Sequence, residues 1–197
     1  MTAPLPFTWP WALVFWVVNT WVYTPEFRLI GRSVGGNPVP AEDRGSMRVL
    51  IVGYFFALFA AFLLPFLAPG AALPGDSRIW FVTGLVLLIA GSALRRHCFR
   101  VLGAFFTGAV TIQAGHRVVD TGAYRWVRHP GYSAGLLIVL GTAVACGNWL
   151  GTAVAFVLAF AGYLYRARIE EQALLAALGE PYARFMATRR RFIPFVV

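Results

Sequence analysis

Long stretches without any Asp, Glu, Lys or Arg are the feature that most constrains what this chain can fold into. Four of them lie at residues 1–25, 49–75, 79–94 and 129–165. A helix needs about 20 apolar residues to cross roughly 30 Å of hydrocarbon, and the fourth stretch is too long for one crossing. Its middle reads Gly147-Asn148-Trp149-Leu150-Gly151, which is typical of a turn. We therefore expect about five membrane-spanning helices, the last two forming a hairpin at roughly 132–147 and 149–165.

The composition supports a location in the membrane. Hydrophobic residues make up 59% of the 197 residues and charged residues only 13%, which is more apolar surface than one water-soluble core can bury. No low-complexity linker or fixed-period repeat divides the chain, so we expect a single membrane domain over residues 1–197. Residues 101–116 are also uncharged, but Gly103, Gly108 and Gly115 disfavour a regular helix, and we expect an interfacial or re-entrant segment. The sequence thus predicts an all-α, polytopic membrane protein.

The arginines predict how the chain crosses the membrane. All 17 basic residues are Arg, and only Arg78 falls between the second and third expected spans. The others lie after the first, third or fifth span. Because basic residues are retained on the cytoplasmic side, we expect the N-terminus outside, the C-terminus inside and the active site facing the cytoplasm.

The net charge of +9 does not indicate nucleic-acid binding, because the arginines border apolar stretches and form no soluble basic face. Attraction of Arg189, Arg190 and Arg191 to anionic lipid headgroups fits their position better. Cys98 and Cys146 are far apart in the sequence, and neither stands at the spacing of a tetrahedral metal site. We expect membrane lipid as a partner, no nucleic acid, no disulfide and no metal ion.

The segment GAYRWVRHPGYSAG, residues 122–135, gathers polar groups at the start of the fourth expected span. Pro130 suits the first turn of a helix, so His129 stands at a helix N-terminus, where backbone N–H groups favour an anionic ligand. Arg125 and Arg128 add donors that suit carboxylate or phosphate groups. Alternatively, these arginines only fix the depth of the helix, and the aromatic residues beside them form an interfacial belt. The residues alone leave both interpretations open.

A second polar segment, YRARIEEQALLAALGEPYARF at residues 165–185, follows the fifth expected span. Arg166 and Glu170 are four residues apart and share one face of a helix. An exposed pair of this kind contributes only about 0.2–1 kcal/mol. An arginine turned into the bundle is instead a candidate for binding or catalysis. We expect this part of the chain to form a cytoplasmic amphipathic helix that ends at Gly179, before Glu-Pro-Tyr.

In their order along the chain, these motifs resemble those of the isoprenylcysteine carboxyl methyltransferase family. The shared motifs are Arg-His-Pro-x-Tyr at 128–132, Arg-x-x-x-Glu-Glu at 166–171, Gly-Glu-x-Tyr at 179–182 and Ile-Pro at 193–194. The resemblance covers roughly residues 95–195. It implies an integral membrane enzyme that transfers a methyl group from S-adenosylmethionine to a lipophilic acceptor, in that family the carboxylate of a prenylated cysteine. Residues 1–94 would hold the first three spans, and residues 95–197 the cofactor-binding and catalytic region.

The resemblance also assigns roles residue by residue. The cofactor pocket would be formed by His116, Gly122, Tyr124, His129, Pro130 and Tyr132, supported by Arg128 and Gly135. The catalytic arginine and glutamate of the family would correspond to Arg166 and Glu170. Candidates for substrate binding are Asn148 and Glu171.

The identity of the acceptor stays open at this point. A carboxylate is nucleophilic at neutral pH, so Arg166 would orient it without a dedicated base. An amine acceptor, as in a phospholipid N-methyltransferase, would need Glu170, Glu171 or His129 to accept a proton. A membrane sterol-type reductase that uses a nicotinamide cofactor and an inert lipid-binding scaffold are further alternatives. The chain has no strand followed by Gly-x-Gly-x-x-Gly, which excludes a soluble dinucleotide-type cofactor fold.

Overall fold

The computed structural model describes residues 3–34, 43–106, 110–112 and 115–193, with the backbone alone for residues 25–34 and 104. The helices, in chain order, are η1 (Leu5–Phe7), α1 (Trp11–Val34), α2 (Ser46–Leu67), η3 (Pro69–Ala71), α3 (Ser77–Leu102), η4 (Gly103–Phe105), η5 (Gly122–Arg125), α4 (Pro130–Ala145), α5 (Trp149–Leu178) and α6 (Glu180–Thr188). Extended pairing within these ranges is limited to the isolated bridges Ala72–Asn148 and Val127–Arg190. The prediction of an all-α fold is confirmed.

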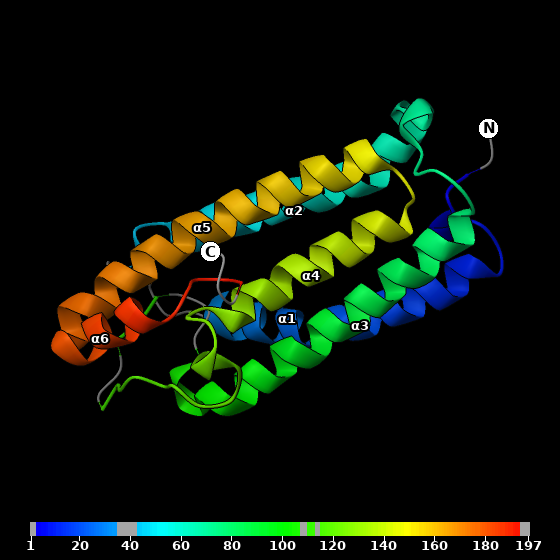
Figure 1. Ribbon diagram of the computed structural model, residues 1–197. Helices are drawn as coiled ribbons and strands as arrows, with labels where there is room; N and C mark the ends of the chain where they lie inside the picture. The colour runs from blue at the N-terminus through cyan, green and yellow to red at the C-terminus, as the bar shows by residue number, and fades with distance from the viewer. Residues whose placement is uncertain (1–2, 35–42, 107–109, 113–114, 194–197) are drawn as a thin grey trace.

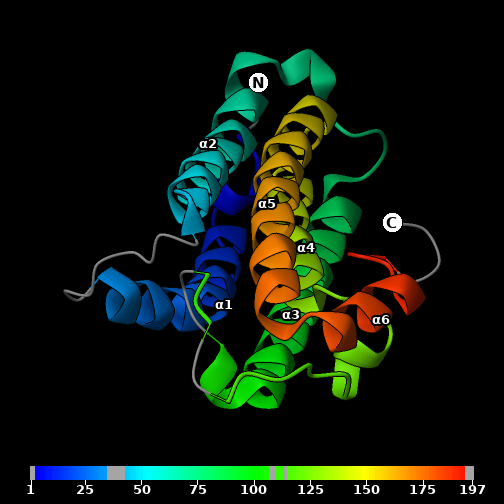
Figure 2. The ribbon, with the colours of Figure 1, turned by 90° about the vertical axis from the view of Figure 1, so that its left-hand side faces the viewer.

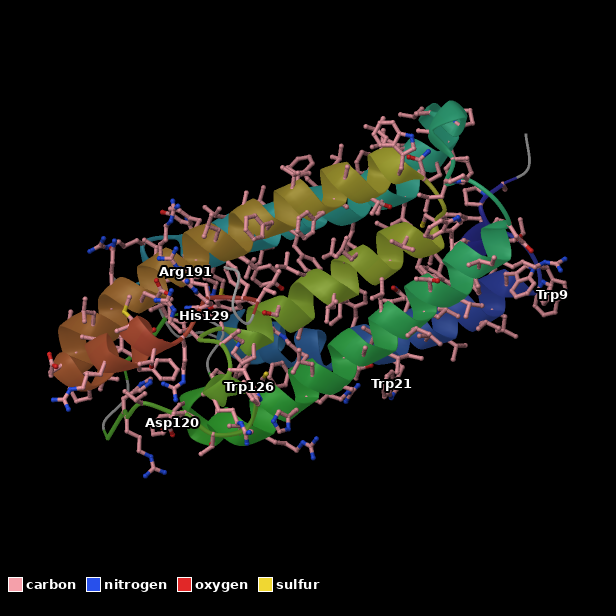
Figure 3. All side chains as sticks on the ribbon, in the orientation of Figure 1. Trp9, Trp21, Asp120, Trp126, His129 and Arg191 are labelled. Carbon is pink, nitrogen blue, oxygen red and sulfur yellow. The ribbon has the colours of Figure 1, made fainter. Side chains whose placement is uncertain are left out.

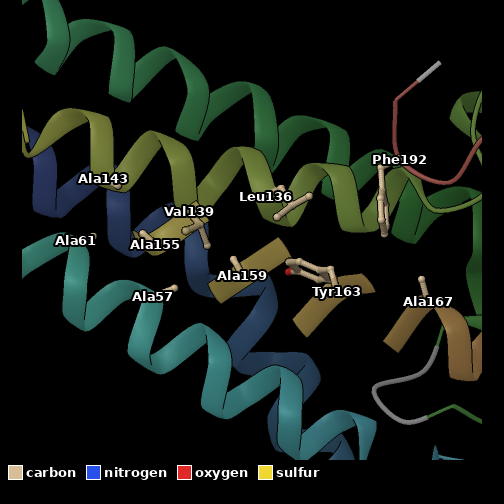
Figure 4. Close-up of a cluster of buried hydrophobic side chains, with 10 residues drawn as sticks. All are labelled: Ala57, Ala61, Leu136, Val139, Ala143, Ala155, Ala159, Tyr163, Ala167 and Phe192. Carbon is tan, nitrogen blue, oxygen red and sulfur yellow. The ribbon is translucent and has the colours of Figure 1, made fainter. Parts of the chain in front are cut away.

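Helix α4 lies in the middle of the bundle, with α3 on one side and the pair α2 and α5 on the other (Figures 1 and 2). One apolar cluster joins α2, α4 and α5, and Figure 4 shows its members. They are Ala57, Ala61, Leu136, Val139, Ala143, Ala155, Ala159, Tyr163, Ala167 and Phe192. A second cluster, around Phe15, Phe81 and Leu88, joins α1, α3 and α4. Because α4 contributes to both clusters, it holds the two halves of the bundle together.

Close approach of α3 and α4 depends on glycine. A Cβ added to Gly84 would lie 2.5 Å from the backbone nitrogen of Ala145, and one added to Gly141 would lie 2.6 Å from the backbone nitrogen of Leu88. Real Cβ atoms do not approach backbone atoms this closely, so the two helices pack backbone against backbone at these positions. Small residues at such crossings are typical of helices that associate within lipid.

Three helices, α2, α3 and α5, are long and apolar enough to cross a membrane, and α4 is a shorter apolar helix. Exposed phenylalanines, such as Phe55, Phe56 and Phe59 of α2, fit a surface that faces lipid.

The helices extend beyond the uncharged stretches from which they were predicted. Helix α1 runs on to Val34, α3 to Leu102 and α5 to Leu178. The uncharged stretches therefore mark the apolar part of each helix and not its end, since arginine and glutamate continue a helix readily. The hairpin of α4 and α5 is confirmed, and α5 ends before Gly179, whose φ of +58° suits glycine.

Asn148 caps α5 at the end of the bundle opposite α6. Its side-chain oxygen accepts a hydrogen bond from the backbone N–H of Gly151 at 2.8 Å, and its amide nitrogen donates to the carbonyl of Ala68 at 2.8 Å. Arg78 lies at this same end, over the ring of Trp11. His129 and Arg191 lie at the other end, far from Trp9 (Figure 3).

Residues 189–192, which we call the return segment, run back from α6 to the start of α4. The backbone N–H of Arg128 donates to the carbonyl of Arg190 at 2.8 Å, and that of His129 donates to the carbonyl of Arg191 at 2.9 Å. The Ser133 hydroxyl donates to the carbonyl of Phe192 at 2.6 Å. Backbone groups at the beginning of α4 are thereby paired with a segment about sixty residues further along the chain.

Candidate active site

A cavity of about 370 Å³ lies at the end of the bundle where α5 and α6 meet the start of α4. Its apolar lining includes residues of α2, namely Leu50, Ile51, Tyr54, Phe55 and Leu58. Polar side chains that line it include Arg95, His116, Arg117, Arg128, His129, Tyr132, Arg166 and Glu170. The cavity therefore joins a charged region to an apolar region within one enclosure, which suits a ligand that has both kinds of surface.

Arg166 and Glu170 meet through the hydroxyl group of Tyr132. Nε of Arg166 donates to the Tyr132 oxygen at 3.0 Å, and the Tyr132 hydroxyl donates in turn to Glu170. The helical spacing of Arg166 and Glu170 turns both side chains toward the same side of α5, where the first turn of α4 presents Tyr132. The Arg166 side chain is 5% exposed, so it is turned into the bundle, as its catalytic assignment requires.

Asp43, just before α2, is fully buried and pairs with Arg166. Its Oδ1 lies 3.3 Å from Nη1 of Arg166 and accepts hydrogen bonds from the Ser46 hydroxyl at 2.9 Å and the Val110 backbone N–H at 3.0 Å. Its Oδ2 accepts from the Met47 backbone N–H at 3.0 Å. Burial opposes ionisation, but these backbone donors outweigh it and hold the pKa of Asp43 below its ordinary value. The carboxylate is thus charged at neutral pH.

His129 contacts a buried group of charged side chains, which is centred on Glu171. Its Nε2 lies 3.1 Å from Oε1 of Glu171, and its ring stacks on Tyr132 with 5.1 Å between the ring centres. Glu171 also forms salt bridges with Nη1 of Arg128 at 3.1 Å and with Nη2 of Arg191 at 2.9 Å. Glu171 therefore fixes the orientation of His129 and holds the return segment in place.

Two buried polar atoms in the cavity wall have no hydrogen-bond partner within the described parts of the chain. They are Nδ1 of His116 and Nε of Arg128. The His116 ring stacks on Phe105, and burial lowers its pKa, so the imidazole is neutral at neutral pH. Buried polar groups are normally paired, so these two atoms are exceptions within the described residues.

The other residues assigned to the cofactor pocket shape the segment that carries His129. Tyr124 lines the cavity, and Pro130 is the first residue of α4. Gly122 has a φ of +59°, and an added Cβ would lie 2.7 Å from Nε2 of His97. Gly135 leaves room for Tyr163, whose hydroxyl oxygen would lie 1.9 Å from an added Cβ. The two glycines act through packing.

Asn148 and Glu171, the candidates for substrate binding, do not line the cavity. Asn148 caps α5 at the opposite end, 18 residues before Arg166, which is roughly 27 Å along a helix. Glu171 is buried among Arg128, His129 and Arg191. The structure gives both side chains roles in the framework, because each already satisfies local hydrogen-bond partners.

The sequence did not single out Asp43 or Arg95, and it assigned Arg191 only to lipid headgroups. Arg95 lines the cavity, and its Nη1 donates to the carbonyl of Gly131 at 2.8 Å. Arg191 binds both carboxylate oxygens of Glu171. A charged residue inside or beside an apolar span is the signal that would have found Arg95. Nothing in the spacing of Asp43 and Arg191 connects either residue with its partner on α5.

Comparison with known proteins places the chain among membrane methyltransferases. The model of the isoprenylcysteine carboxyl methyltransferase (ICMT) family matches residues 84–176. A probable protein-S-isoprenylcysteine O-methyltransferase of Oryza sativa subsp. indica is 29% identical over 152 residues, which cover 75% of this chain and 80% of that protein. Protein-S-isoprenylcysteine O-methyltransferase B of Arabidopsis thaliana is 27% identical over 163 residues, covering 80% and 83%.

A solved structure of the eukaryotic intramembrane Ras methyltransferase ICMT has the same arrangement of helices. The two align with a TM-score of 0.60 and 26% identity, over 74% of this chain and 52% of the other. This chain therefore spans about half the length of that protein. The matched residues 84–176 contain His129, Tyr132, Arg166 and Glu170, which line the cavity. The chain is thus a multi-pass integral membrane protein that is similar to the isoprenylcysteine carboxyl methyltransferase family over residues 84–176.

Proposed function

We propose that this protein transfers a methyl group from S-adenosylmethionine, the methyl donor of its family, to the carboxylate of a prenylated cysteine or a similarly lipophilic acid. The observation that carries the proposal is the linked set Arg166, Tyr132 and Glu170 in the wall of a cavity whose other wall is apolar. Such a cavity accommodates a carboxylate with a long hydrocarbon chain attached.

The polar end of the cavity fits the methyl donor. Nδ1 of His116 and Nε of Arg128 are buried and unpaired within the described residues, and both side chains line the cavity. They suit a ligand that carries amino, carboxylate and hydroxyl groups. His116, Arg128 and His129 would hold this ligand, and Tyr124 would pack against it. When bound, it supplies a methyl carbon activated by a positive sulfonium.

Arg166 would orient the acceptor carboxylate. Its guanidinium is held by Tyr132 and Asp43, so the group is already aligned before the acceptor binds. A carboxylate at neutral pH needs no base, and the work of the protein is alignment inside a pocket that excludes water. Glu170 would hold Tyr132, and through it Arg166, in one geometry.

The apolar tail of the acceptor would lie along α2. Ile51, Phe55 and Leu58 line the cavity, and Phe55 is also 63% exposed. A side chain that faces both the cavity and the lipid marks a lateral path between them. Entry from the membrane spares a long hydrocarbon chain from crossing water.

We propose five membrane crossings, made by α1 to α5, with the N-terminus outside and the active site and α6 on the cytoplasmic side. Arg78 lies at one end of the bundle, while Arg95, Arg128 and Arg166 lie toward the other. The excess of arginine at the cavity end supports a cytoplasmic location for it.

Purified protein in lipid nanodiscs tests the proposal. We expect saturable calorimetric binding of S-adenosylhomocysteine and no binding of a nicotinamide dinucleotide. We also expect methylation of an N-acetylated S-prenyl cysteine, with no reaction of its methyl ester. In Arg166→Ala, kcat should fall about 100-fold or more. Arg168→Ala, an exposed arginine on the same helix, is the matched control and should keep wild-type kcat.

Other outcomes separate the alternatives. Methylation of phosphatidylethanolamine instead of the prenyl cysteine would replace the carboxylate acceptor by an amine. Binding of the dinucleotide alone would indicate a reductase. Folded protein that binds neither ligand would indicate an inert scaffold.

A further inference from the structure

Asp43 stands outside the segment that matches the family, yet it lies against the centre of the candidate active site. The family match covers residues 84–176, whereas Asp43 precedes α2. Its side chain is fully buried and lies 3.3 Å from the Arg166 guanidinium. A charge buried without a partner is costly, so the two side chains stabilise each other's ionised form.

The Arg166 guanidinium is held at two different nitrogens. Nε donates to the Tyr132 hydroxyl at 3.0 Å, and Nη1 lies 3.3 Å from Oδ1 of Asp43 and 3.4 Å from the Ser46 hydroxyl. Because the guanidinium is planar, two attachments at different nitrogens define the plane of the whole group. Without the Asp43 carboxylate, Nη1 loses its charged partner, and the plane of the group is held less firmly.

Asp43 also connects the separate pieces of chain that enclose the cavity. One oxygen accepts from Val110, in the connection between α3 and α4, and the other accepts from Met47, at the start of α2. Both Val110 and Met47 line the cavity, as does Arg166 on α5. The carboxylate is therefore the common partner of three elements that surround the reacting groups.

We propose that Asp43 is a positioning residue of the methyl-transfer site, which sets the plane of the Arg166 guanidinium for the incoming acceptor. This inference rests on the function proposed for Arg166. Asp43 acts through that side chain and does not touch either substrate. Losing it should lower kcat while leaving the affinity for the donor nearly unchanged, because the polar end of the cavity keeps His116 and Arg128.

The competing interpretation is that Asp43 only stabilises the start of α2. The chain offers a matched control, because Asp76 also accepts a backbone hydrogen bond at a helix start, from Arg78 at 2.9 Å. Asp76 caps α3 at the opposite end of the bundle and is exposed. Asparagine serves at helix starts as well as aspartate does. Asp43→Asn and Asp76→Asn thus make the same change, but only the first removes a charge beside Arg166.

Kinetics of five proteins test the proposal, measured in single-turnover mode with excess enzyme. They are the wild type, Asp43→Asn, Arg166→Lys, the double variant and the control Asp76→Asn. We expect Asp43→Asn to lower the rate about 10- to 100-fold and to change the affinity for S-adenosylhomocysteine less than about 3-fold. In the Arg166→Lys background, Asp43→Asn should lower the rate less than about 3-fold, because a lysine side chain has no planar group to orient. Asp76→Asn should match the wild type.

Equal losses from Asp43→Asn in both backgrounds would overturn the proposal, and so would a wild-type rate in Asp43→Asn. If the wild type itself does not methylate the prenyl cysteine, the proposed acceptor is wrong, and nitrogen-15 spectra of the arginine side chains test Asp43 independently. We expect separate Nη signals for Arg166 in the wild type and averaged signals in Asp43→Asn, where rotation is faster. Unchanged signals would show that Asp43 does not orient the guanidinium.

Discussion

At the scale of single residues, Tyr132 contacts three other residues of the candidate site. Its hydroxyl accepts a hydrogen bond from Arg166 and donates one to Glu170, while its ring stacks on His129. One side chain thus connects the residue expected to hold the acceptor with a residue expected to hold the donor. The hydroxyl and the ring have separate tasks, and substitution can separate them.

Replacing Tyr132 with Phe should lower kcat about 10- to 100-fold, because Arg166 loses a partner and Glu170 loses a donor. The stacking on His129 remains, so the affinity for S-adenosylhomocysteine should stay within about 3-fold of wild type. Steady-state kinetics and calorimetry measure the two effects. Tyr165→Phe, at an exposed position of α5, is the control. A parallel loss of binding and turnover would assign Tyr132 to the donor pocket alone.

Most polar residues of the cavity could be predicted from the sequence, because they belong to motifs of residues that are close together in the chain. The spacing of Arg166 and Glu170 predicted that they share a helix face, and His129 and Tyr132 belong to one short motif. Asp43 reaches Arg166 only through the folded bundle, 123 residues away. No periodicity in its own segment indicates that partner, and the structure was needed to find it.

At the scale of helices, the glycines between α3 and α4 set how closely the bundle packs. The apolar stretches predicted both helices, but they did not predict which faces meet, since that depends on side-chain size at each crossing. Gly84 and Gly141 stand where an added Cβ would meet the backbone of the facing helix. The start of α4 carries His129 and Tyr132, so the depth of this packing also positions the site.

Gly141→Ala should destabilise the protein by about 1–3 kcal/mol, because its new methyl group would press on the backbone of Leu88. Gly151→Ala is a suitable comparison, since its nearest atoms would be 3.4 Å away. That variant should unfold within about 1 kcal/mol of wild type. Thermal unfolding in one detergent measures both, and equal behaviour of the two variants would contradict tight packing at Gly141.

At the scale of the whole molecule, the charges are distributed unequally between the two ends of the bundle. The end with the α2–α3 connection and the hairpin turn carries Arg78, whereas the cavity end carries the arginines that line or support the site. This asymmetry was evident in the sequence before any contact was known. The proposed orientation in the membrane follows from it.

Cysteine labelling in intact cells tests that orientation. Ser77 and Ala187 are exposed at opposite ends of the bundle, while the native Cys98 and Cys146 are buried. A membrane-impermeant maleimide should label Ser77→Cys from outside and should label Ala187→Cys only after the cells are opened. The reverse pattern would place the active site outside.

The return segment is made last among the parts of the candidate site, and it closes contacts that begin much earlier in the chain. The ribosome makes His129 and the start of α4 well before it makes Glu171 and Arg191, which surround them in the folded protein. A nascent chain that has already inserted α4 therefore lacks the buried charges that hold His129. The surroundings of His129 are therefore complete only after residues near 191 have been synthesised.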